Sequence, residues 1–319
     1  MANPPMNINS DSLFYAKILL FGEYGIIRDS MGLSIPYSTY GGSFEFAENA
    51  GEFESASQNA LRNYLNHLEL LKAEKTLPCE MKLDAFKDDL AKGMYFNSSI
   101  PQGFGVGSSG ALVAAVYNRY AINPIPKKAN LLPKEIADLK QILGKLESYF
   151  HGKSSGLDPL ICYLQLPVLI KSGNELGTVE LPTQSLGNAA IFLINSGHPG
   201  STQTMVEIFM ENMKNDGFRK MLKNQFIKHN DACIKAFVKG ELRSLFSHLK
   251  KLSQVLLDNF SPMIPENFHG LWKQGIESGD YYLKLCGSGG GGFILGFTED
   301  YSKVEEVLYD YHPILIQKL

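Results

Sequence analysis

Residues Pro101–Gly110 have the composition of a loop that binds an anion. The segment reads Pro-Gln-Gly-Phe-Gly-Val-Gly-Ser-Ser-Gly and continues through good helix formers to Tyr117. Alternate glycines let the backbone approach a ligand closely and adopt positive φ. The start of a helix adds unpaired N–H groups and the positive end of a dipole. The spacing therefore predicts a nucleotide-phosphate loop, in which Ser108 and Ser109 cap the helix or ligate Mg²⁺.

Two other interpretations of this loop are open at this point. The segment from Gly105 to Gly110 matches the Gly-x-Gly-x-x-Gly pattern of Rossmann proteins. However, Pro101 stands where that motif needs an uninterrupted strand, and the loop begins a third of the way along the chain. There is no Walker sequence ending in Gly-Lys-Ser/Thr. The other interpretation is that the segment binds no ligand and is a glycine-rich turn before a core helix.

Lys17 is a charged residue inside an apolar segment. Residues 16–21 read Ala-Lys-Ile-Leu-Leu-Phe, which is typical of a buried strand. A lysine in such a strand commonly extends its ammonium to water from the strand end. The functional alternative is a cation directed at a phosphate or at a reacting hydroxyl.

Two carboxylates fall at positions suited to phosphoryl chemistry. Glu147 lies at the edge of the apolar face of a helix expected over residues 133–150. It is either a solvated boundary residue or a metal ligand held in a cleft. Asp158 ends the polar, glycine-punctuated segment 151–158. It either starts a turn or is a general base on a rigid loop. The strand-like run 160–164 follows it.

The remaining pattern indicates the elements that must position these side chains. A second glycine loop, Cys286–Gly292, lies between two short apolar segments. Four consecutive glycines are costly to order, so their backbone must approach another strand or a ligand closely. The other expected elements are strands within 33–54 and at 189–194, 281–285, 293–297 and 313–316, and helices at 57–72, from the glycine loop to about 120, across 202–260 with breaks near 215–217 and 240, and at 303–309.

Composition restricts the partners and the compartment. The chain has 319 residues, 44% of them hydrophobic and 20% charged, and a net charge of −3. This charge gives no reason to expect binding to nucleic acid or to an anionic membrane. The four cysteines are far apart, which argues against a zinc cluster and a disulfide framework. Without a secretory signal or a long apolar segment, the expected location is the cytoplasm.

Three ordered motifs together resemble the GHMP small-molecule kinase superfamily, and within it the mevalonate kinases. They are Lys17-Ile-Leu-Leu-Phe-Gly-Glu-Tyr-Gly25, the loop from Pro101 to Ala111, and Lys284-Leu-Cys-Gly-Ser-Gly-Gly-Gly-Gly-Phe293. The sequence His151-Gly-x-x-Ser-Gly-x-Asp158, with Glu147 eleven residues before the aspartate, is similar to the mevalonate kinase pattern. Asn195-Ser-Gly and Ser201-Thr202 are similar to the segment that approaches mevalonate in that family.

The resemblance implies an α+β fold with two domains. Residues 1–187 would form an N-terminal ATP-binding domain of the ribosomal protein S5 domain 2-like type. Residues 188–319 would form a ferredoxin-like C-terminal domain, with the active site between the two.

The resemblance also implies transfer of the γ-phosphoryl group of Mg·ATP to the hydroxyl of mevalonate, a step of isoprenoid precursor synthesis. Asp158 would accept the hydroxyl proton, and Lys17 would stabilise the developing charge. Ser109 and Glu147 would hold Mg²⁺. The nucleotide-binding residues would be Pro101, Gly103, Gly105, Val106, Gly107, Ser108, Ser109 and Gly110. The substrate-binding residues would be Glu23, Tyr24, His151, Ser155, Gly156, Thr202, Gly287, Ser288 and Gly289. The partner would be a small molecule, and a homodimer is left open.

The chain departs from the family pattern in ways that concern substrate identity. Tyr24 stands where mevalonate kinases usually have histidine, and phosphomevalonate kinases also have tyrosine there. Arg28–Asp29 replaces a more apolar stretch, and Gly110 replaces an alanine. The rival hypotheses are a GHMP kinase for phosphomevalonate or a sugar, a catalytically silent ligand-binding homologue and, least favoured, a Rossmann dehydrogenase. A silent homologue need not keep all of the predicted catalytic and metal-binding residues. Their joint presence argues against this rival: Lys17, Ser109, Glu147 and Asp158.

Overall fold

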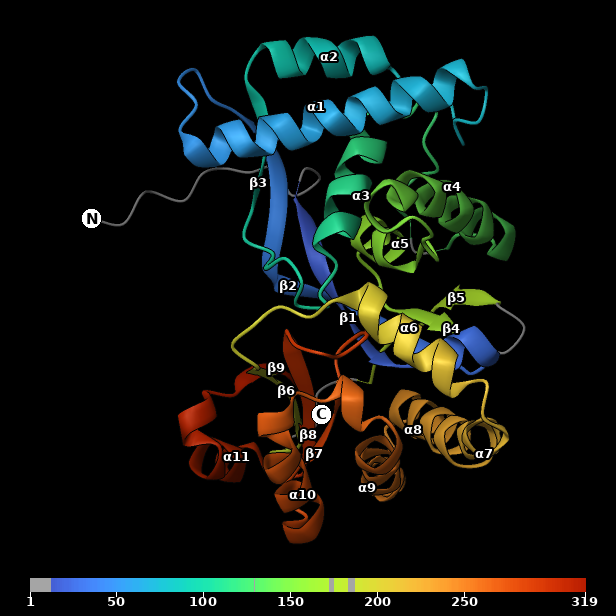
Figure 1. The fold of residues 1–319 in the computed structure, drawn as a ribbon, viewed down its shortest axis with the longest axis vertical. Coiled ribbons are helices and arrows are strands. Elements are labelled where there is room, and N and C mark those ends of the chain that lie inside the picture. The colour runs from blue at the N-terminus through green and yellow to red at the C-terminus, as the bar shows by residue number, and fades with distance from the viewer. Residues whose placement is uncertain (1–12, 129, 172–174, 183–186) are drawn as a thin grey trace. The chain divides into compact units, whose positions relative to one another are not determined.

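The computed structural model describes residues 13–128, 130–171, 175–182 and 187–319, and these residues form helices and two sheets (Figure 1). Its contacts define two compact units. Unit 1 contains the chain up to Lys17, Pro36–Ile100 and Gly107–Gln165. Unit 2 contains Ile18–Ile35, Pro101–Val106 and Leu166–Leu319. Because the units are not continuous in sequence, the expected domain boundary at 187/188 stays a prediction.

The first sheet is built around one long strand. Its strand order is β1-β2-β4-β5, with β3 also paired to β2. In unit 2, residues 32–34 of β2 pair with β4, whereas in unit 1 residues 42–46 pair with β3. The strands are β1 (Phe14–Phe21), β2 (Gly32–Phe46), β3 (Met94–Ser98), β4 (Val168–Ile170) and β5 (Leu176–Thr178).

In the described part of unit 1 there are five helices, and three of them carry residues that the sequence predicts for the site. They are α1 (Glu52–Ala73), α2 (Leu83–Ala91), α3 (Ser108–Tyr120), α4 (Pro133–His151) and α5 (Leu157–Leu164). Helices α3, α4 and α5 pack against one another, and α1 and α2 lie side by side (Figure 1). The small residues Ala111, Ala114 and Ala115 of α3 are buried and permit this close packing. The expected helices at 57–72, 108–120 and 133–150 are confirmed.

Two short segments differ from their sequence-based expectation. Residues 160–164 were expected as a strand but form the second half of α5. Every α5 residue except Asp158 is buried. A continuous apolar run of this length is compatible with either a buried strand or a buried helix. The segment 51–54 was expected to extend strand structure, but Gly51 caps α1 and the following residues form its first turn.

The second sheet lies in unit 2 and has the strand order β7-β8-β6-β9, with every pair antiparallel. In chain order this is the ferredoxin-like arrangement, in which helices follow the first and third strands. The α+β fold with a ferredoxin-like C-terminal part is thereby confirmed. The strands are β6 (Ala190–Asn195), β7 (Tyr282–Leu285), β8 (Phe293–Thr298) and β9 (Ile314–Lys318).

The helices of unit 2 occupy the connections of this sheet. Helices α9 and α10 pack on β7, and α8 packs along α9 (Figure 1). The expected breaks are confirmed, because the Asn215 side chain caps α7 and Gly240 adopts positive φ before α9. The helices are α6 (Thr202–Asn212), α7 (Asp216–Met221), α8 (Lys228–Val238), α9 (Leu242–Asn259), α10 (His269–Ser278) and α11 (Tyr301–Val307). Across the described residues, no helix has the length and apolar character needed to cross a membrane.

Candidate active site

Lys17 and Asp158 form an ion pair in unit 1. The Lys17 Nζ lies 2.9 Å from Asp158 Oδ1. The lysine side chain is 4% exposed and the aspartate side chain 40% exposed. The interpretation of Lys17 as a lysine that extends to water is therefore wrong, because its ammonium is buried and directed at a carboxylate. Asp158 lies in the first turn of α5 rather than on a loop, where the helix dipole favours a negative charge.

Glu147 lies beside this pair and accepts two hydroxyl hydrogen bonds. Ser109 Oγ donates to Glu147 Oε1 at 3.0 Å, and Ser154 Oγ donates to Oε2. Glu147 is buried, so the interpretation of it as a solvated boundary residue is also wrong. Neither serine at the start of α3 caps that helix by its side chain, since Gly107 is the N-cap and no side-chain capping bond forms there. Ser109 instead bonds to the buried carboxylate.

Two glycines let these elements approach one another. A Cβ on Gly110 would lie 2.8 Å from the backbone carbon of Asp158, so only glycine allows α3 this close to the start of α5. The departure from alanine at this position therefore has a packing reason. Gly107 adopts φ +81°, and its Cβ would lie 3.0 Å from Lys17 Cγ. The last glycines of the loop thus place the start of α3 against the Lys17–Asp158 pair.

Burial determines the protonation chemistry of the cluster. Burial, together with the neighbouring Asp158 charge, raises the pKa of Glu147 to about 7, while the bonds from Ser154 and Ser109 oppose the rise. Burial also raises the pKa of the Cys162 thiol, whose sulfur lies near the Gly107 carbonyl. Cys162 is therefore a protonated thiol rather than a nucleophile.

The donor atoms of the cluster suit a hard cation. Ser109 Oγ and the Glu147 carboxylate are oxygen ligands of the kind that Mg²⁺ uses together with the phosphates of a nucleotide. A cation would also offset the cost of ionising a buried glutamate beside Asp158. Within the described ranges, no three His, Cys, Asp or Glu side chains form a metal-binding group. A metal at Glu147 would therefore need the serine hydroxyl and ligand oxygens to complete its coordination.

In unit 2, Glu23 forms a second buried ion pair. Its Oε1 lies 2.5 Å from Lys284 Nζ, and the two side chains are 2% and 1% exposed. Burial raises the pKa of Glu23, and Lys284 opposes this rise. The pair joins the segment after β1 to β7, the strand that leads into the second glycine loop.

Tyr24 connects the same two segments through its hydroxyl. It donates to the Ser288 carbonyl at 2.5 Å, and its ring stacks on Phe209 with centroids 4.7 Å apart. Tyr24 is buried and has φ +56°, a conformation unusual for a non-glycine residue. Burial raises the pKa of its hydroxyl, which therefore stays protonated and remains a donor.

The glycines of the second loop approach backbone closely. A Cβ on Gly291 would lie 2.8 Å from Gly200 N, and one on Gly292 would lie 2.6 Å from Phe104 Cα. A Cβ on Gly105 would lie 2.6 Å from the Cys286 carbonyl oxygen. Gly287 differs, since its Cβ would meet nothing closer than 3.5 Å. Gly105 and Gly292 thus let the two glycine-rich segments pack together within unit 2, and Gly291 lets the second segment approach Gly200.

The structure gathers the predicted site residues into two groups, one in each unit. Thr202, at the start of α6, accepts a hydrogen bond from Ser288 at 3.2 Å. Ser155 is exposed and accepts the Leu157 N–H at 3.4 Å. His151 ends α4, and its side chain lies outside the described part of the chain. Unit 1 holds Lys17, Gly107, Ser108, Ser109, Gly110, Glu147, Ser155, Gly156 and Asp158; unit 2 holds Glu23, Tyr24, Pro101, Gly103, Gly105, Val106, Thr202, Gly287, Ser288 and Gly289.

Sequence reasoning missed Ser154 and the role of Lys284. Ser154 bonds to Glu147, but spacing does not distinguish it from its neighbour Ser155. Lys284 belongs to the third motif, but no pattern identifies Glu23 as its partner. The available signal was a lysine inside an apolar strand, the same signal that identified Lys17.

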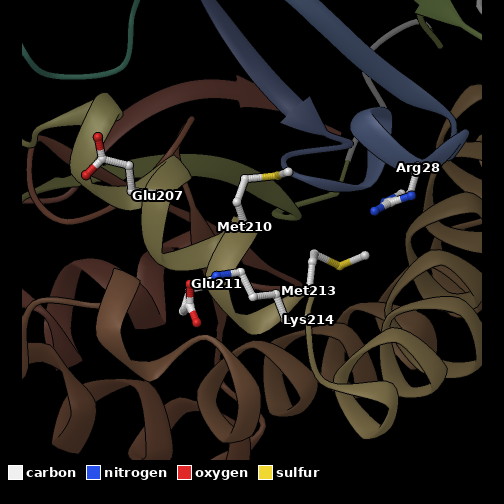
Figure 2. Close-up of a pocket in the computed structure, with 6 residues that line it drawn as sticks. All are labelled: Arg28, Glu207, Met210, Glu211, Met213 and Lys214. Carbon is white, nitrogen blue, oxygen red and sulfur yellow. Dashed lines mark ion pairs between the residues drawn. The ribbon is translucent and has the colours of Figure 1, made fainter.

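An open hollow of about 510 Å³ lies beside α6 in unit 2, and none of the predicted site residues lines it (Figure 2). It is lined by Arg28, Glu207, Met210, Glu211, Met213 and Lys214. Lys214 pairs with Glu211 at 2.6 Å, while Arg28 extends from the segment in which this chain departs from the family pattern.

Comparisons with known proteins agree with this fold. Residues 66–165 match the family model of the GHMP kinases N terminal domain. The fold is similar to that of L. major mevalonate kinase in complex with R-mevalonate, with 16% identity, 100% of each chain covered and a TM-score of 0.64. It is also similar to Streptococcus pneumoniae phosphomevalonate kinase in complex with phosphomevalonate and AMPPNP, with 14% identity, 96% and 98% covered and a TM-score of 0.62.

A third similar structure is Lactococcus lactis galactokinase complexed with galactose, with 16% identity, 96% and 93% covered and a TM-score of 0.58. No curated protein matches the chain. At these identities the structural likeness establishes the fold, and the family model covers the segment that contains the predicted phosphate loop and both candidate carboxylates. Residues 66–165 therefore resemble the N-terminal domain of GHMP kinases, and the chain has the fold of these kinases, which confirms its resemblance to the GHMP superfamily and to mevalonate kinases.

Proposed function

We propose that this protein is an ATP-dependent kinase that transfers the γ-phosphoryl group of Mg·ATP to the hydroxyl of mevalonate, in isoprenoid precursor synthesis. The observation that carries the proposal is the cluster in which Lys17 pairs with Asp158 at 2.9 Å while Ser109 bonds to the buried Glu147. Phosphoryl transfer depends on positioning and charge neutralisation more than on covalent chemistry. A lysine, a carboxylate base and a pair of oxygen ligands for a metal supply these functions.

In the proposed reaction Asp158 is the general base. Its carboxylate accepts the proton of the substrate hydroxyl as the oxygen forms a bond to the γ-phosphorus. The bond between that phosphorus and the oxygen bridging to the β-phosphate breaks, and ADP leaves with the bonding electrons. Lys17 holds Asp158 in place and stabilises the negative charge on the substrate oxygen and the transferring group. The products are the phosphorylated alcohol and ADP, and the proton leaves from Asp158 to solvent.

The metal and the nucleotide fit the same group of residues. Ser109 and Glu147 would hold Mg²⁺, which would neutralise charge on the phosphates. The start of α3 offers its unpaired N–H groups to an anion, and Gly107 keeps side-chain atoms away from them. GHMP kinases bind ATP, and the similar phosphomevalonate kinase is complexed with the ATP analogue AMPPNP.

Mevalonate is the acceptor that the motif pattern favours. The His151–Asp158 spacing carries this choice, and a mevalonate kinase covers the full chain in the structural comparison. Tyr24, which stands where mevalonate kinases usually have histidine, is the residue that concerns this choice of acceptor. Its hydroxyl donates a hydrogen bond to the Ser288 carbonyl.

The proposal is tested by measuring ADP release with Mg·ATP and a panel of mevalonate, phosphomevalonate, galactose and homoserine. Turnover on mevalonate alone supports the assignment. Turnover on another member of the panel retains the kinase and changes the substrate. If no member reacts and the protein does not bind ATP in a calorimetric titration, the kinase proposal fails.

Replacing the base separates binding from chemistry. Asp158→Asn should lower kcat by about 10²- to 10⁴-fold, because the amide cannot accept the hydroxyl proton, while ATP binding persists. The matched control is Asp138→Asn, an exposed aspartate on α4. Single-turnover kinetics and ATP titration of both variants give the comparison. An Asp158→Asn enzyme with unchanged turnover would remove Asp158 from the mechanism.

A further inference from the structure

Ser154 is held in one orientation by hydrogen bonds on both sides. Its hydroxyl oxygen accepts the Gly156 N–H at 2.9 Å, and its proton is donated to Glu147 Oε2. A serine hydroxyl has a single proton to donate. Because the Gly156 N–H occupies the acceptor side, the proton is directed at the carboxylate.

The Gly156 N–H, which donates to Ser154, is itself fixed by packing. Gly156 adopts φ +75° as the N-cap of α5. A Cβ at this position would clash with the Lys140 carbonyl oxygen and lie 2.9 Å from Gly144 N. Gly156 therefore keeps α4 and the start of α5 in close contact, and its N–H reaches Ser154 from a rigid backbone. Two residues later the same backbone carries Asp158.

Each oxygen of Glu147 thus receives one serine hydroxyl. Ser109 donates to Oε1 and Ser154 to Oε2. A carboxylate oxygen has two acceptor directions, so one on each oxygen is left for a cation. Ser109 comes from α3 and Ser154 from the segment between α4 and α5. The carboxylate of Glu147 is consequently held from two independent elements.

We propose that Ser154 is a positioning residue that fixes the Glu147 carboxylate for Mg·ATP. This inference rests on the proposed function, in which Glu147 binds the metal. Hydrogen-bond partners of metal-binding carboxylates orient the ligand, and their loss typically lowers metal affinity about 10- to 100-fold. Ser154 acts through Glu147 and needs no contact with the metal. Its neighbour Ser155 accepts the Leu157 N–H instead and, among the described residues, makes no hydrogen bond to Glu147.

The test compares variants that differ in one hydroxyl. Mn²⁺ is the probe, and its binding in the presence of ATP is measured by the EPR signal of the free ion. Ser154→Ala should raise the Kd for Mn·ATP about 10- to 100-fold, and Ser154→Thr, which retains the hydroxyl, should restore most of the affinity. Ser148→Ala is the matched control, because Ser148 lies next to Glu147 on α4 but bonds to the Lys145 carbonyl. Urea unfolding of each variant verifies that the fold is retained.

The outcomes separate this inference from the proposed function. If the wild-type protein binds no Mn·ATP, the metal role of Glu147 fails and the role of Ser154 fails with it. If the wild type binds Mn·ATP and Ser154→Ala binds it equally well, the positioning role alone is overturned. Equal losses in Ser154→Ala and Ser154→Thr would also overturn it, because the effect would then not follow the hydroxyl.

Discussion

Replacing Glu147 by glutamine should stabilise the free protein at alkaline pH while it impairs the use of Mg·ATP. Glu147 is buried, and burial beside the Asp158 charge raises its pKa to about 7 from an ordinary value of 4.5. At pH 8 the folded protein therefore contains a buried carboxylate that would be more stable in the unfolded chain. Glutamine has nearly the same shape and carries no charge, so the substitution removes this cost.

The size and sign of the effect follow from the two pKa values. In the folded state the pKa is raised, so the folded protein binds more protons than the unfolded chain between pH 4.5 and about 7. The stability that Glu147 contributes is therefore fully present below pH 4.5 and is lost as the pH rises through about 7. At about 1.4 kcal/mol per pKa unit, the difference corresponds to about 3 kcal/mol at pH 8. Glu147→Gln should gain up to this amount at pH 8 and almost nothing at pH 4.5.

Urea unfolding at pH 4.5, 6 and 8, in EDTA and without nucleotide, measures this dependence. The matched control is Glu135→Gln on the same helix. Glu135 is partly exposed and accepts the Leu132 N–H, which lowers its pKa. Its contribution has the opposite sign, because it is present above the unfolded pKa and is lost at acid pH. Glu135→Gln should therefore lose stability at pH 8. A Glu147→Gln protein whose stability difference from wild type is the same at pH 4.5 and 8 would refute the reasoning.

Two further substitutions test unit 2, both by urea unfolding. Lys284→Met should cost about 3–5 kcal/mol, because it leaves the buried Glu23 carboxylate unpaired; Lys273→Met, which breaks an exposed pair with Glu277, is the control and should change stability by less than about 1 kcal/mol. Equal effects of the two would show that burial of the Glu23 pair has no energetic consequence. Gly291→Ala should destabilise far more than Gly197→Ala, because both have positive φ but only the Gly291 Cβ would meet backbone, at 2.8 Å. Gly197→Ala should cost about 1–2 kcal/mol from its conformation alone, and a similar cost at both positions would contradict the close packing.

Sequence patterns predicted those parts of the fold in which local physics and tertiary packing agree. The helix after the predicted phosphate loop begins at Ser108 and ends at Tyr120, as expected from the glycines before it and its helix formers. The two strands around the second glycine loop are present because short apolar runs bounded by glycine have few other solutions. The ferredoxin-like strand order, by contrast, came from the resemblance, since periodicity does not determine which strands become neighbours.

The errors occurred where burial on all sides removes periodicity. In α5 nearly every side chain is apolar and buried, so neither a twofold nor a 3.6-fold pattern is visible. Pro159 is compatible with the helix because it lies in the first turn, where a missing N–H has no cost. Ser154 was missed for a different reason. Its function depends on the direction of one hydroxyl, and a pair of adjacent serines contains no information on direction.

Lys17 and Lys284 are both buried, but the carboxylates with which they pair differ in exposure. This difference distinguishes a structural ion pair from one that can take part in a reaction. Lys284 and Glu23 are both nearly inaccessible, at 1% and 2% exposed. A pair closed to solvent on both sides has no room for a reacting group. Lys17 is equally buried at 4%, but its partner Asp158 is 40% exposed. A carboxylate held by a buried cation and still open on one side can accept a proton from a bound molecule. Both lysines interrupt an apolar strand in the same way, so the exposure of the partner, which only the structure supplies, identifies Lys17 as the lysine of the candidate active site.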